Sequence, residues 1–145
     1  MHIPFTSDAE VIAISEGVVA RTLPKPEWTH AAHFAAAVWL IAGQSVLVPE
    51  RDMPGLIRAY NSATGVANTD HEGYHETITQ ASLRATRGFL AGLPEGTALF
   101  AACNALLATD LGRRDWLLTY WSRERLFSVE ARRGWVEPDV QALPF

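Results

Sequence analysis

The sequence has little cysteine, no excess of basic charge and no long apolar run, and each shortage excludes a class of protein. The single cysteine, Cys103, cannot form an internal disulfide, so a reducing, cytoplasmic setting is expected. A formal net charge of −4 argues against a general nucleic-acid binder, which would present a basic face. The apolar run over residues 31–43 is too short to span a bilayer, and no signal peptide is visible at the start. We therefore expect a small molecule as ligand or substrate, and neither a membrane nor a nucleic acid as partner.

Strict alternation of apolar and polar residues, the pattern typical of a β-strand, is also missing, as are repeats and linkers. With 145 residues the chain has the length of one domain with a proper core. The prediction is an all-α single domain over 1–145, a bundle of five to seven helices with an extended C-terminal tail. The first expected helix starts at the capping box of residues 7–10, and the last starts near residue 114. Between them, helices are expected over 29–42, from 52 to Gly65, over 74–91 and over 95–108.

The most apolar helix is expected to begin at the segment Trp28-Thr29-His30-Ala31-Ala32-His33. Thr29 is a good N-cap residue, and positions 30, 33, 34, 37, 38 and 41 form a core-facing stripe. The opposite face is apolar as well, which indicates a central helix with neighbours on several sides. His30 and His33 are therefore predicted to be buried together in its first turn.

Burial and the positive end of the helix dipole both disfavour protonation, so these two imidazoles should stay neutral. A neutral imidazole is the form that ligates metals or acts as a base. The i, i+3 spacing places His30 and His33 on one face, close enough to share a partner.

A second histidine cluster lies in Asp70-His71-Glu72-Gly73-Tyr74-His75-Glu76-Thr77. His71 to His75 formally matches the H-E-x-x-H zinc-peptidase pattern, but that motif needs a continuous helix and the residues around it favour a loop. His75 is instead expected at the start of a helix. Thr79, one turn later, could orient its ring. Glu76 is the best general base nearby, and Glu72 the alternative.

Together the two segments predict a metal site with His30, His33 and His75 as ligands and Glu76 or His71 as a fourth contributor. Three nitrogen ligands with an open position are typical of catalytic zinc, and an added carboxylate would suit iron or manganese. Such a divalent metal would acidify a water or polarise a carbonyl, so a hydrolase or lyase acting on a small molecule is expected. Tyr60 could donate its phenol to this site, although core tyrosines are common.

Two alternatives stay open. The histidines could form a metal-free pocket that binds or senses a small ligand, or they could satisfy each other and buried backbone groups. The arginine pairs at 113–114 and 132–133 are interpreted as solvated helix ends, and the tryptophans as core residues.

At these residues the sequence resembles a family of uncharacterised bacterial helical proteins. The shared motifs are an aromatic-Thr-His-x-x-His start, here 28–33, and a Tyr-His-Glu-Thr-x-Thr segment, here 74–79. The resemblance implies one fold and one shared site without naming a reaction. It favours His30, His33 and His75 over His71, which falls outside the shared motifs.

Overall fold

The computed structural model describes residues 4–145, and these residues form seven α-helices and no β-strand. The all-α prediction is confirmed. The α-helices are α1 (Asp8–Val19), α2 (His30–Val38), α3 (Pro49–Ala63), α4 (Glu76–Ala91), α5 (Leu99–Leu107), α6 (Arg123–Leu126) and α7 (Val129–Arg133). Shorter turns are the 3₁₀ segments η1 (Lys25–Glu27), η3 (Asp110–Gly112) and η4 (Trp116–Thr119) and the π-helical segment η2 (Trp39–Gly43). No helix among the described residues is both long and apolar enough to cross a membrane.

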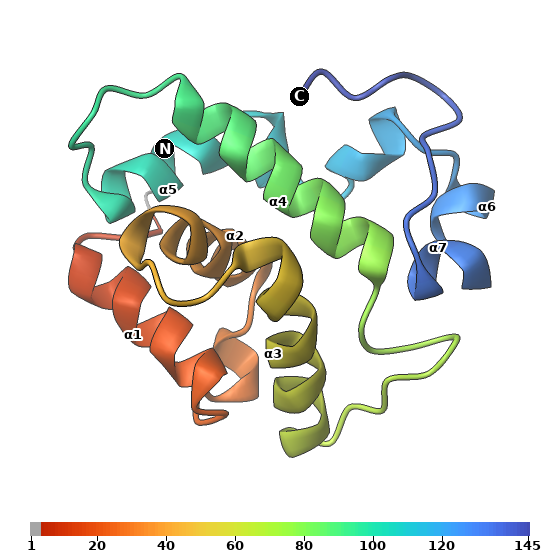
Figure 1. The fold of residues 1–145 in the computed structure, drawn as a ribbon, viewed down its shortest axis with the longest axis horizontal. Helices are drawn as coiled ribbons and strands as arrows, with labels where there is room; N and C mark the ends of the chain where they lie inside the picture. The colour runs from red at the N-terminus through yellow and green to blue at the C-terminus, as the bar shows by residue number, and fades with distance from the viewer. Residues whose placement is uncertain (1–3) are drawn as a thin grey trace.

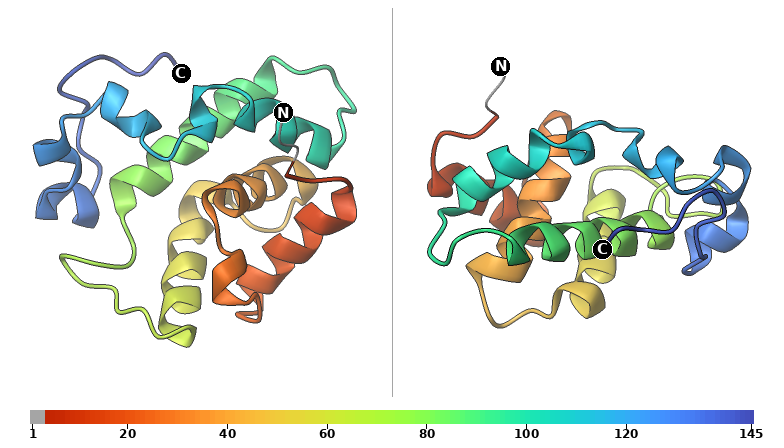
Figure 2. Two further views of the ribbon diagram at one scale, coloured as in Figure 1. Left: turned by 180° about the vertical axis from the view of Figure 1, so that it is seen from behind. Right: turned by 90° about the horizontal axis from the view of Figure 1, so that it is seen from above.

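Helix α2 is the central element, as its all-round apolar surface predicts. It packs against α1, α4 and α5. The long helix α4 crosses the molecule between the α1–α3 group and the chain that leads to α6 and α7 (Figure 1). Four alanines of α2 are buried, and small side chains let neighbouring helices approach closely. The view from behind and the view from above show the same arrangement (Figure 2).

The starts of the helices follow from local capping residues. Ser7 accepts a hydrogen bond from the backbone N–H of Glu10, and Thr29 accepts one from Ala32. Helix α3 begins three residues before Asp52, because the Asp52 carboxylate accepts from the N–H of Val48 instead. Helix α2 is shorter than predicted, since its last turn widens into η2.

The chain after α5 does not form the helix predicted from about residue 114. It forms two 3₁₀ turns and two short helices, α6 and α7, capped by Ser122 and Ser128. The C-terminal tail makes hydrogen bonds with this segment. The Trp121 indole donates to the carbonyl of Val136 at 3.0 Å, and the N–H of Val140 donates to the carbonyl of Tyr120 at 2.9 Å. The tail is extended, as expected, and packs back on the body.

Cys103 lies in the core of α5, where burial raises the pKa of its thiol to about 12. This is the inert buried thiol that its apolar neighbours predict.

Candidate functional site

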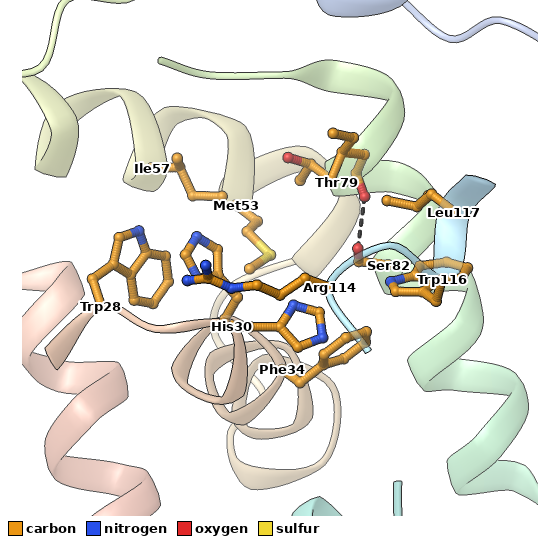
Figure 3. Close-up of a pocket in the computed structure, with 12 residues that line it drawn as sticks. Trp28, His30, Phe34, Met53, Ile57, Thr79, Ser82, Arg114, Trp116 and Leu117 are labelled. Carbon is orange, nitrogen blue, oxygen red and sulfur yellow. Dashed lines mark hydrogen bonds between the residues drawn. The ribbon is translucent and has the colours of Figure 1, made fainter. Parts of the chain in front are cut away.

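A pocket of about 310 Å³ opens above the first turn of α2. Its walls come from α2, α3, α4 and the chain from Arg114 to Leu117 (Figure 3). Most of its lining is apolar or aromatic, with a few polar side chains among them. The lining residues are Trp28, His30, His33, Phe34, Met53, Ile57, Ile78, Thr79, Ser82, Arg114, Trp116 and Leu117.

His30 is anchored to a distant part of the chain. Its Nε2 lies 2.8 Å from the carbonyl oxygen of Leu111 in η3, so this nitrogen carries the proton and donates. The ring also packs edge-on against Phe34, with centroids 5.2 Å apart. The second nitrogen, Nδ1, makes no hydrogen bond among the described residues and holds a free lone pair.

His33 is anchored within its own helix start. Its Nδ1 donates to the carbonyl of Thr29 at 2.7 Å, and its ring stacks on Trp28 with centroids 3.7 Å apart. Burial, assisted by the nearby His30 and Arg114, lowers the pKa of His33 to about 4. The ring is therefore neutral at pH 7, and its Nε2 is a hydrogen-bond acceptor.

The free nitrogens of both histidines are accessible, and both side chains are half-buried and line the pocket. No fully buried side-chain nitrogen or oxygen of residues 4–145 is left without a hydrogen-bond partner. The unpartnered Nδ1 of His30 and Nε2 of His33 must therefore reach accessible space.

Two hydroxyls of α4 face the same pocket. Thr79 donates to the carbonyl of His75 at 2.9 Å, and Ser82 donates to that of Ile78 at 2.7 Å, the contact drawn in Figure 3. The hydroxyl proton of each residue is thus used in a bond to the backbone, and its oxygen can accept a hydrogen bond. Thr79 contacts the backbone of His75 and not its ring, so the predicted orienting role is replaced by a place in the pocket wall.

Arg114 supplies the positive charge of the pocket. Its side chain extends from the segment after η3 across the pocket toward Trp28 (Figure 3). It makes no hydrogen bond or ion pair within residues 4–145, whereas the neighbouring Arg113 lies 3.9 Å from Asp115. Arg114 is exposed, as interpreted, but it lies outside any helix and lines the pocket, so its interpretation as a helix end is wrong.

His75 does not join the other two histidines. It is the N-cap of α4, and its Nδ1 accepts from the N–H of Ile78 at 3.1 Å. Its Nε2 donates to the carbonyl of Leu126 at 2.7 Å. The ring is buried, which lowers its pKa. Both nitrogens are used in structural bonds, so neither is available as a ligand in this conformation.

The remaining predicted site residues lie outside the pocket. Glu76 accepts a hydrogen bond from the Tyr74 hydroxyl, and Tyr60 is a core residue whose hydroxyl donates to Leu23 at 2.7 Å. His71 and Glu72 lie exposed on the loop before α4. The structure therefore brings together His30, His33 and Thr79, and separates the other five.

No group of three or more histidine, cysteine, aspartate or glutamate side chains in residues 4–145 is placed to hold a metal. The free nitrogens of His30 and His33 could supply two ligands, and the others would have to come from water or substrate. A divalent metal, zinc or iron or manganese, stays a prediction.

Sequence reasoning missed Arg114, Met53 and the role of Trp28 and Trp116 as pocket walls. These residues come from three separate segments, near 28, 53 and 114–116. The local signal of a pocket wall in the sequence is the mixture of apolar groups and hydroxyls at 78, 79 and 82. Comparison with models of known protein families, with curated proteins and with solved structures finds no match.

Proposed function

We propose that this protein is a metal-free small-ligand binding or sensing domain, with its ligand in the pocket above the first turn of α2. A cavity of about 310 Å³ is at the lower end of the range for small-molecule sites. Apolar walls with a few fixed polar groups are typical of such sites.

The contrast between His75 and the other two histidines carries the proposal. His75 shows what a structural histidine does in this fold: both of its nitrogens bond to backbone groups. His30 and His33 each fix one nitrogen on a backbone carbonyl and leave the other open. Burial keeps the His33 ring neutral. Rings that are held rigidly with a free acceptor are prepared to receive a hydrogen-bond donor from a ligand.

The test is an NMR titration of ¹⁵N-labelled protein with a panel of single-ring phenols, amides and acids, with EDTA present throughout. We expect shifts of the backbone amides of His30, His33, Ser82 and Leu117 that saturate with concentration. The same shifts should be lost in His33→Gln and kept in His71→Gln, the matched exposed histidine. Shifts scattered over the surface, or equal shifts in both variants, would overturn the proposal.

A metal-dependent hydrolase or lyase is the second candidate, favoured by the two free nitrogens on one turn of α2. It requires zinc, iron or manganese to co-purify with the protein and to be lost in both His30→Ala and His33→Ala. Less than about one-tenth equivalent of metal, after growth with zinc and iron supplied, would contradict it.

A further inference from the structure

We infer that the ligand of this pocket is a single-ring carboxylic acid that carries a hydrogen-bond donor on the side away from its carboxylate. This inference rests on the proposed function and specifies the ligand's chemical class. It follows from the charges, the hydrogen-bonding groups and the shape of the pocket, taken in turn.

The charge of the pocket calls for an anion. Arg114 is the only charged residue among those that line it, and no aspartate or glutamate is among them. The guanidinium has no hydrogen-bond or ion-pair partner within residues 4–145, so its charge is free to pair with an incoming anion. Arginine binds carboxylates through two parallel N–H···O bonds. One guanidinium balances one negative charge, which favours a carboxylate over a doubly charged phosphate monoester.

The hydrogen-bonding groups of the pocket favour a ligand that carries a hydrogen-bond donor. The four polar side chains that accompany Arg114 each donate a hydrogen bond to a backbone carbonyl: His30, His33, Thr79 and Ser82. They offer only acceptors to the pocket, at its α2 and α4 walls. A ligand without an O–H or N–H group would leave these acceptors desolvated and unpaired, which costs about 1–3 kcal/mol per group.

The shape of the pocket favours a ligand with a flat apolar ring between its carboxylate and its hydrogen-bond donor. Trp28, Phe34 and Trp116 offer aromatic faces or edges, and the sulfur of Met53 points into the middle of the pocket (Figure 3). Thioether and aromatic groups make favourable contacts with a ring. The small volume limits that body to about one ring. Arg114 reaches the Trp28 side of the pocket, away from Thr79 and Ser82 (Figure 3), so the carboxylate binds on that side and the donor faces the α4 hydroxyls.

The experiment compares three matched probes by isothermal titration calorimetry at pH 7 with EDTA. The probes are 4-hydroxybenzoate, its methyl ester, which lacks the charge, and benzoate, which lacks the donor. We expect 4-hydroxybenzoate to bind at least about tenfold more tightly than either of the others, as one charge-assisted or buried hydrogen bond requires.

Two variants assign the effect to a residue. Arg114→Gln should reduce the affinity for 4-hydroxybenzoate to that for the ester and leave ester binding unchanged. Arg113→Gln, the adjacent exposed arginine, should change neither. Thermal unfolding followed by circular dichroism checks that both variants are folded, which the exposure of both side chains favours.

Each other outcome overturns the inference. Equal affinity for acid and ester, or binding of the acid that survives Arg114→Gln, excludes the carboxylate. Equal affinity for 4-hydroxybenzoate and benzoate excludes the donor. If none of the three binds, the single-ring acid is excluded, while the NMR panel with its neutral amides and phenols judges the proposed function separately.

Discussion

Three histidines lie at the starts of two helices, His30 and His33 in the first turn of α2 and His75 at the N-cap of α4, and their ring nitrogens make different bonds. The sequence predicts the helix starts and the lowered pKa of His33, because capping and burial are read from neighbouring residues. It does not predict the bonding partners. Leu111 lies 81 residues from His30, and Leu126 lies 51 residues from His75. His75 is structural because its second nitrogen also accepts from Ile78, whereas the second nitrogens of His30 and His33 have no partner among the described residues.

His75→Ala should lower the free energy of unfolding by about 2–4 kcal/mol. The change removes an N-cap, worth about 1 kcal/mol, and leaves the carbonyl of Leu126 without a partner in a buried place. His75→Asn should recover about 1 kcal/mol, since asparagine can cap Ile78 but cannot reach Leu126. Urea unfolding followed by circular dichroism measures all three proteins.

Ligand binding in the pocket is the control for this prediction. Binding of the probes by folded His75→Ala should match the wild type. Loss of a bound metal in this variant, with the fold intact, would instead restore His75 to the predicted ligand set.

At the scale of elements, helices with local caps are predictable and the chain from 112 onward is not. Trp116, Leu117, Tyr120 and Trp121 have helical spacing, so a pattern of apolar residues favours one helix here. The extended tail takes hydrogen bonds from this segment and divides it into short turns. The position of Arg114 depends on that division, which explains why the sequence did not reveal it as a pocket residue.

Gly112→Ala should destabilise the protein by several kcal/mol and weaken probe binding. A Cβ at this position would lie 2.0 Å from the carbonyl oxygen of Leu107, a backbone atom that cannot move without shifting α5. The displaced η3 segment contains Leu111, whose carbonyl holds His30, and it is followed directly by the chain that positions Arg114. Thermal unfolding and calorimetry measure the two effects.

Gly55→Ala is the matched control, because nothing lies within 4 Å of the added Cβ in the middle of α3. It should stabilise the protein by about 0.5–1 kcal/mol, the helix preference of alanine over glycine. A Gly112→Ala variant as stable as the wild type would show that η3 is not held against α5 in this way.

At the scale of the whole molecule, buried neutral histidines connect stability to pH. The pKa of His33 is about 4 in the folded chain and about 6.5 in an unfolded one. Between these values the unfolded chain binds a proton that the folded chain does not, so stability falls as pH falls from about 6.5 to about 4. Burial shifts His75 in the same direction.

The contribution of His33 to this loss should be at most about 3 kcal/mol. It is measured as the difference in unfolding free energy between wild type and His33→Gln in urea, at several pH values from 7 to 4. The curve for His33→Gln should be flatter, and that for His71→Gln should parallel the wild type. A wild-type curve that parallels His33→Gln would mean that His33 is protonated normally in the folded protein.

The bond between His30 and Leu111 also has a consequence for how the protein is made. The α2 wall of the pocket is synthesised about 81 residues before Leu111 and the opposite wall that carries Arg114 and Trp116. A nascent chain that ends before Leu111 can form α1, α2 and α3, but it lacks the carbonyl that anchors His30 and the guanidinium that binds the carboxylate. Occupancy of the pocket would therefore distinguish chains that extend past Leu117 from shorter ones.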